Sequence, residues 1–180
     1  MTLALQTLIP PFQVGFYEKE GHSQNSKDIS YKRLESFSFE GMLVHSLRAL
    51  FGALLKQDYD KSFFDTKALR ALSKLTTLDS ILYARGVGNL SAMKLTHIAL
   101  QTLHKTKDIN IYAGDIFSFS QSKEIKAFGA MSYFLKEEEG LKSIVLEKSL
   151  SPSIEFYMPE ILSLKDFKQP LEPLYITNYL

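Results

Sequence analysis

Two short apolar segments joined by an amphipathic one constrain the fold of this chain more than any other feature. Residues 81–84 and 109–113 have the length and aliphatic content of buried strands. Between them, residues 91–104 repeat apolar side chains at helical spacing, after a turn that contains Gly86 and Gly88. A helix between two strands crosses over one face of a sheet, so the two strands are expected to be parallel neighbours.

Three further strands are expected before this unit. Residues 3–8 and 12–17 are aliphatic and aromatic runs separated by Pro10-Pro11, which is typical of antiparallel strands joined by a tight turn. Residues 29–39 alternate apolar and polar side chains with one break in phase, and this pattern predicts a third strand. An antiparallel ribbon followed by a parallel unit predicts an α/β protein with a mixed sheet.

Two helices are predicted between the ribbon and the parallel unit. Residues 41–56 carry apolar side chains at helical spacing, and residues 65–75 form a shorter helical pattern with Asp65 as N-cap. Further along, residues 126–136 fit either a helix or a bent strand. The acidic turn at residues 137–140 favours a hairpin over 126–146.

Composition limits the function classes. The chain has 180 residues, of which 45% are hydrophobic, and this is enough for a proper core in one domain or two small ones. It has no cysteine, which removes disulfides and thiolate metal sites. A net charge of +1 argues against a protein whose main role is to neutralise nucleic-acid phosphates. We find no signal peptide or membrane-spanning stretch, and we expect a soluble, cytoplasmic protein without a membrane partner.

The turn at residues 86–91 is the first candidate for chemistry. Its glycines follow a strand and precede a helix, where backbone N–H groups can approach a phosphate. The turn is one glycine short of the dinucleotide fingerprint, although Asp115 lies roughly where a ribose-binding acid is expected. We favour the alternative, a structural turn in which Asn89 or Ser91 caps the helix.

Other catalytic patterns do not occur in the sequence. His22, His45, His97 and His104 form neither an HxxxH nor an HExxH pair, so no metal site is expected. The sequence has no GxSxG elbow and no phosphate-binding GxxxxGK[ST] motif. Carboxylates cluster at 18–20, 58–60 and 137–139, and we interpret these clusters as solvated turns. No base, nucleophile and oxyanion site assemble from these residues.

Four segments resemble motifs of the TsaB (YeaZ) family, in the same order. Residues 82–95, LYARGVGNLSAMKL, resemble the family's strand–turn–helix signature xYGRGPGSFTGxRIG. Residues 3–7 (LALQT), 45–50 (HSLRAL) and 172–176 (EPLYI) resemble its ILAIDT, HTxxxL and EPxYLR segments. The resemblance implies an actin/Hsp70/sugar-kinase-like (ribonuclease H-like) fold. It divides the chain into a first domain over 1–114 and a reduced second domain over 115–180.

The resemblance also implies a function. Proteins of this family are non-catalytic partners of the TsaD-type threonylcarbamoyl-transferase and work with the TsaE-type ATPase to modify the adenosine beside the tRNA anticodon. They form homodimers and heterodimers through helices of the first domain, and the resemblance implies no cofactor and at most indirect contact with tRNA. Lysines 105, 107, 123 and 126 are interpreted as ordinary solvated side chains.

This chain departs from the family at the positions where nucleotide chemistry would be expected. Gln6 stands where the family's first strand has Asp, so metal and phosphate binding become less expected. The family-motif turn is retained as Gly86, Val87, Gly88, Asn89 and Ser91, with Ala92 in place of the third glycine. A diverged nucleotide-binding or sugar-kinase-like protein that uses this turn remains the alternative function.

A partner interface is expected on two helices, since they carry more apolar side chains than one sheet contact uses. The residues assigned to it are Leu43, His45, Leu47, Arg48, Leu50, Phe51, Leu54, Met93 and His97. In the alternative, the wide apolar arc packs beneath the ribbon and the helix at 65–75.

Overall fold

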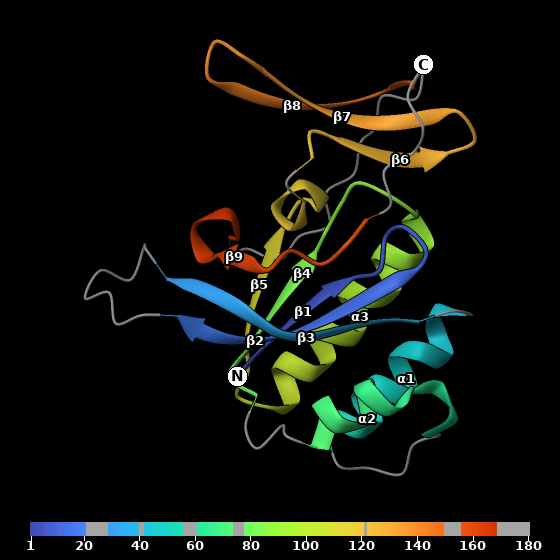
Figure 1. Ribbon diagram of the computed structural model, residues 1–180, viewed down its shortest axis with the longest axis vertical. Helices are drawn as coiled ribbons and strands as arrows, with labels where there is room; N and C mark the ends of the chain where they lie inside the picture. Colours follow the sequence, from blue (N-terminus) through green and yellow to red (C-terminus); the bar gives the residue numbers. More distant parts are fainter. Residues whose placement is uncertain are drawn as a thin grey trace.

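A computed structural model describes residues 1–20, 29–39, 42–55, 61–73, 78–120, 122–149 and 156–168. These residues form a six-stranded mixed sheet and a separate three-stranded antiparallel sheet (Figure 1). The strands of the large sheet, in spatial order, are β5 (Asn110–Gly114), β4 (Ser80–Ala84), β1 (Thr2–Gln6), β2 (Phe12–Glu20), β3 (Ser30–Phe39) and β9 (Ile161–Ser163).

The large sheet confirms the predicted ribbon and parallel unit. β1 pairs antiparallel with β2, and β2 pairs antiparallel with β3. On its other side β1 pairs parallel with β4, which pairs parallel with β5. The helix α3 (Leu90–Thr106) makes the crossover between β4 and β5. The prediction of an α/β protein with a mixed sheet and flanking helices is confirmed.

A bulge explains the break in phase along β3. Phe16 pairs with Glu35 and Tyr17 pairs with Arg33, so Leu34 is an extra residue on its strand. One extra residue reverses the alternation of side chains. Phe37 therefore packs in the core on the helix side of the sheet, whereas Tyr31 packs in the cluster on the opposite face.

Three helices cover one face of the large sheet. They are α1 (Leu43–Leu54), α2 (Thr66–Ser73) and α3, with a short 3-10 turn, η1 (Lys61–Phe63), before α2. Leu50, Ala68 and Leu100, one from each helix, pack against buried strand residues in a single core. Asp65 caps α2 as predicted, because its Oδ1 accepts a hydrogen bond from the Ala68 N–H at 2.7 Å. The predicted helix ends at 41, 56, 74 and 75 lie outside the described residues.

The small sheet settles the ambiguous segment in favour of a hairpin. β6 (Glu124–Phe128), β7 (Met131–Glu138) and β8 (Leu141–Lys148) pair in sequence order, so the helix considered for residues 126–136 is wrong. The acidic turn between β7 and β8 places Glu139 and Gly140 at φ 52° and 79°. Glu137, Glu138 and Glu139 are exposed there, as expected of a solvated turn.

The end of the described chain returns to the large sheet. β9 pairs antiparallel with β3, and Lys168 bridges Ala113 at the end of β5. Between β5 and β6 a 3-10 turn, η2 (Ile116–Phe119), packs on the face opposite the helices, and a further turn, η3 (Leu164–Asp166), follows β9. Residues after Gly114 therefore contribute to both sheets.

Candidate functional site

The glycine turn between β4 and α3 lies against the loop that follows β1. Gly88 has φ 150°, and a Cβ atom added to it would lie 2.5 Å from the Cβ of Leu8 and 2.8 Å from its carbonyl oxygen. The Asn89 N–H donates to that same carbonyl at 3.0 Å. The close backbone approach that glycine permits is therefore made to Leu8, a fully buried residue, and the space beside Gly88 is filled by the protein itself.

The polar residues near this turn cap short local elements. The Oδ1 of Asn89 accepts from the Ala92 N–H at 2.9 Å, so Asn89 rather than Ser91 is the N-cap of α3. Asp115, considered as a ribose-binding acid, accepts from the Ser118 N–H at 3.1 Å and caps η2. Both observations agree with the structural interpretation of these residues.

The side chain of Gln6, at the end of β1, forms hydrogen bonds with the loop that follows this strand. Its Oε1 accepts from the N–H groups of Leu8 and Ile9 at 2.7 and 3.0 Å, and its Nε2 donates to the Ile9 carbonyl at 2.9 Å. The residue is fully buried. The amide thus fixes the loop that carries Leu8 toward Gly88, where the resembled family has a carboxylate.

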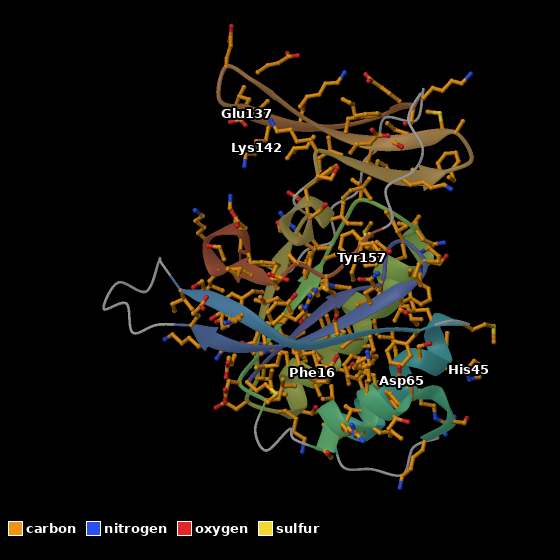
Figure 2. All side chains as sticks on the ribbon, in the orientation of Figure 1. Phe16, His45, Asp65, Glu137, Lys142 and Tyr157 are labelled. Atoms are coloured by element: carbon orange, nitrogen blue, oxygen red, sulfur yellow. The ribbon has the colours of Figure 1, made fainter. Side chains whose placement is uncertain are left out.

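Residues predicted for a partner interface divide between the interior and the surface. Leu43, Leu47, Leu50 and Met93 are buried, Phe51, Leu54 and His97 are half-buried, and His45 and Arg48 are exposed. Leu43 and Leu47 pack against Ala92, which brings α1 and α3 side by side. Much of the wide apolar arc of α1 therefore packs inside the chain. Figure 2 shows the contrast between Phe16 inside the core and His45 on the outer side of α1.

Sequence reasoning missed apolar side chains that the same two helices leave at the surface. Val44 on α1 and Ile98 on α3 are 55% and 63% exposed, and Met42 and Leu90 at the starts of these helices are also exposed. We define the α1–α3 surface as Met42, Val44, His45, Arg48, Leu90 and Ile98. These residues lie outside the buried faces of α1 and α3. Only the packing of the helices shows which apolar residues are buried and which are exposed.

His97 ties α3 to the sheet. Its Nδ1 forms a hydrogen bond of 3.2 Å with the Tyr83 hydroxyl on β4. Burial lowers the pKa of His97 below its usual value and raises the pKa of Tyr83 to about 12. The pair is therefore uncharged near neutral pH, and it joins α3 to β4.

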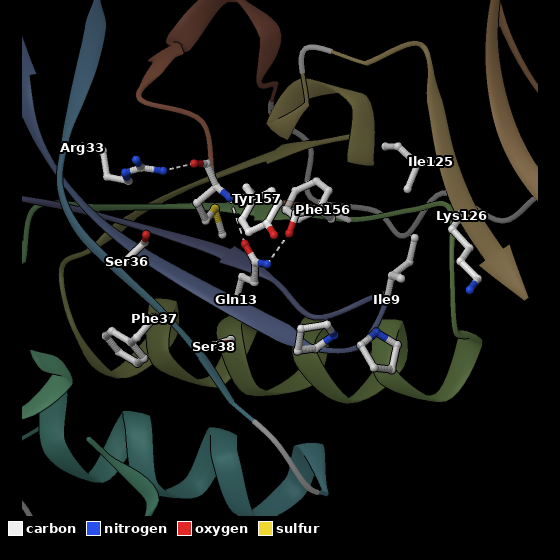
Figure 3. A pocket seen from close by; sticks show the side chains of 13 residues that line it. Ile9, Gln13, Arg33, Ser36, Phe37, Ser38, Ile125, Lys126, Phe156 and Tyr157 are labelled. Carbon is white, nitrogen blue, oxygen red and sulfur yellow. Dashed lines mark hydrogen bonds between the residues drawn. The ribbon is translucent and has the colours of Figure 1, made fainter. Parts of the chain in front are cut away.

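A cleft between the two sheets was not predicted. Its volume is about 500 Å³, and it lies over β2 and β3, on the face opposite the helices. The lining residues are Ile9, Pro10, Pro11, Gln13, Arg33, Ser36, Phe37, Ser38, Ile125, Lys126, Phe156, Tyr157 and Met158 (Figure 3).

One wall of this cleft is a segment, residues 156–160, that side chains of the sheet hold in place. Gln13 donates through Nε2 to the Phe156 carbonyl and accepts from the Met158 N–H at 2.9 Å. Arg33 donates through Nη1 to the Met158 carbonyl. We call residues 156–160 the strap. No local sequence pattern indicates the strap, because its partners lie more than a hundred residues away.

Tyr17 fixes the far end of the strap. Its hydroxyl donates to the Pro159 carbonyl at 2.6 Å, and burial raises its pKa. The Arg33 N–H also donates to the Glu160 carbonyl at 2.7 Å, ahead of β9. The strap is therefore bonded to the large sheet at both ends.

The described residues contain no group of three or more His, Asp or Glu side chains placed to hold a metal ion. In the same part of the chain no helix has both the length and the apolar character needed to cross a membrane. His22, the carboxylates at 58–60 and the motif at 172–176 lie outside the described residues.

Solved structures that are similar to this chain include the following two. One is titled an uncharacterized protein with similarity to peptidase YEAZ from Pseudomonas aeruginosa; it is 15% identical, with a TM-score of 0.38, over 85% of this chain and 68% of its own. The other, YeaZ from Pseudomonas aeruginosa, is 15% identical with a TM-score of 0.37, over 94% of this chain and 70% of its own. No protein-family model and no curated protein matches the chain. Both titles contain the name YeaZ, which is also the name of the family whose motifs the sequence resembles.

Proposed function

We propose that this chain is a non-catalytic partner subunit of a tRNA threonylcarbamoyladenosine-modifying assembly. It binds a TsaD-type transferase through the α1–α3 surface and forms a homodimer through the same surface. A TsaE-type ATPase is a further partner, tRNA is contacted at most indirectly, and the assembly works in the cytoplasm. The resemblance of the sequence motifs to the TsaB (YeaZ) family supports the proposed role. The exposed apolar side chains of α1 and α3 support the choice of binding surface.

The observation that carries the proposal is the exposure of Val44 and Ile98 on two helices that pack directly together. Contacts between Leu43, Leu47 and Ala92 hold α1 against α3, so the two helices that carry these exposed side chains are packed together before a partner binds. Protein interfaces typically have apolar side chains at their centre and polar side chains, often including an arginine, around them. Arg48 and His45 supply that polar character here.

A structural role for the glycine turn supports a non-catalytic subunit. Leu8 fills the space beside Gly88, and within the described residues the Gln6 side chain bonds to the loop that carries Leu8. The residues that would serve a phosphate in a kinase-like protein serve the fold here. For this reason we place the function on the outer side of the helices and not at the turn.

The experiment compares two substitutions of exposed apolar residues. Ile98→Asp changes the α1–α3 surface. Leu141→Asp changes an apolar residue on β8, in the other sheet, that is even more exposed, at 76% against 63% for Ile98. Affinity for the TsaD homologue of the same cell is measured by titration calorimetry. We expect Ile98→Asp to weaken binding at least about tenfold and Leu141→Asp to change it less than about twofold.

Circular dichroism spectra checked beforehand must show both variants folded. Equal effects of the two substitutions would contradict the assignment of the surface.

A further inference from the structure

We propose that the cleft between the two sheets is a binding site for a small organic anion with an apolar ring body. The cleft lies on the sheet face opposite the helices, since Gln13, which lines it, alternates with Val14 of the helix-side core. The site is thus separate from the α1–α3 surface. A volume of about 500 Å³ falls in the range of small-molecule sites.

The charged groups that line the cleft have one sign. Among the lining residues that the structure describes, the ionisable side chains are Arg33, Lys126 and Tyr157, and none is a carboxylate. Figure 3 shows Arg33 and Lys126 at opposite sides of the cleft, one on β3 and the other on β6. Two cations in the described lining of a concave site favour a positive potential there, and such a potential favours an anion.

Within the described residues, the guanidinium of Arg33 uses only part of its donor capacity. Its Nη1 donates to the Met158 carbonyl of the strap, which fixes the guanidinium at the cleft wall. A guanidinium has five N–H donors, and its planar edge matches a carboxylate or phosphate. The Leu34 bulge brings Arg33 to this face, because without the extra residue the side chain would point toward the helices.

Polar and apolar groups in the lining fit the two parts of such a ligand. Ser36 and Ser38, further along β3 than Arg33, add hydroxyl donors to the lining, and within the described residues neither hydroxyl makes a hydrogen bond. Phe156, Tyr157, Ile9 and the two prolines supply an apolar surface on which a ring can lie. Tyr157 is 69% exposed at the cleft, between the two sheets in Figure 2.

The strap gives this site a rigid wall. Gln13 bonds to the backbone on both sides of Tyr157, so the segment that carries the aromatic side chains is held by the sheet. Because the wall is fixed before binding, little conformational entropy is lost when a ligand enters. The site therefore resembles a preformed small-molecule pocket.

The test uses the fluorescent anion anilinonaphthalene sulfonate, which combines aromatic rings with a negative headgroup. Its neutral relative N-phenylnaphthylamine reports apolar binding alone. The variants are Lys126→Glu, which lines the cleft, and the matched control Lys123→Glu, an exposed lysine on the same stretch of chain that does not line it.

We expect one saturable site for the anion. Lys126→Glu should weaken it about tenfold, Lys123→Glu less than about twofold, and the neutral probe should respond to neither substitution. Ser38→Trp, which fills the cleft without changing charge, should displace both probes.

Competition with naphthoate and with naphthyl phosphate then distinguishes a carboxylate from a phosphate headgroup, and displacement by either supports the site. Unsaturable binding, equal effects of Lys126→Glu and Lys123→Glu, or failure of both competitors would overturn the proposal.

Discussion

Gly88 lies so close to Leu8 that a Cβ atom on the glycine would stand 2.5 Å from the Cβ of Leu8. This contact accounts for a glycine that, in sequence, resembles part of a phosphate-binding motif. The turn before α3 and the loop after β1 are packed together, and the Asn89 N–H bonds to the Leu8 carbonyl at the same place. In this protein the glycine turn allows the start of α3 and the loop after β1 to pack closely together.

A side chain at Gly88 should destabilise the protein strongly. Gly88→Val combines an unfavourable φ with a clash against the Leu8 backbone, and we expect a loss of about 3 kcal/mol or more in the free energy of unfolding. Urea denaturation measures the loss. The matched control is Gly129→Ala, also at positive φ but with no atom within 4 Å of its added Cβ, for which about 1 kcal/mol is expected. Similar losses for both variants would show that φ alone matters.

Charge substitutions on α1 should separate core from surface. Leu50 is 1% exposed in the core under the sheet, so Leu50→Asp should abolish the folded state, because an unpaired carboxylate would be buried. Val44→Asp, on the same helix, should leave the far-ultraviolet circular dichroism spectrum and the melting temperature nearly unchanged. If Leu50→Asp remained folded, the position would not be part of the core.

Removing the Gln13 amide should loosen the strap. Gln13→Ala leaves the Phe156 carbonyl and the Met158 N–H without their partner, and the expected cost is about 1–3 kcal/mol. Hydrogen exchange at the Met158 amide should become faster than in the wild type, whereas amides in α1 should not change. Ser38→Ala, at the position paired with Gln13 on β3, is the control and should leave the Met158 amide protected.

Stability should depend on pH through His97. Burial lowers the folded-state pKa below the usual 6.5, so the unfolded chain binds more protons as the pH falls through that value. The contribution is fully present above about pH 6.5 and is lost as the pH falls toward the folded-state pKa. The free energy of unfolding, measured between about pH 7.5 and about pH 5.5, should fall less steeply for His97→Gln than for the wild type. Equal slopes would contradict the assignment.

Most of the fold could be predicted from local patterns in the sequence. The apolar runs around Pro10-Pro11, the Asp65 cap and the acidic turn after β7 each depend on neighbouring residues, and each was predicted. The phase break in β3 was visible as well, although only the structure shows that an extra Leu34 causes it.

The candidate sites were harder to predict, because they depend on packing between distant segments. Val44 and Leu50 are both apolar residues of one helix, and only the position of the sheet buries one and exposes the other. The cleft depends on Gln13 meeting a strap that begins at residue 156, and three-residue β9 is too short to show a periodicity.

The central claim is that this chain is a partner subunit, and size-exclusion chromatography with light scattering tests it most directly. The protein is run alone and mixed with the TsaD homologue from the same cell. We expect a homodimer when the protein is run alone and a stoichiometric complex in the mixture. Two separate species in the mixture, at concentrations well above those in the cell, would contradict it.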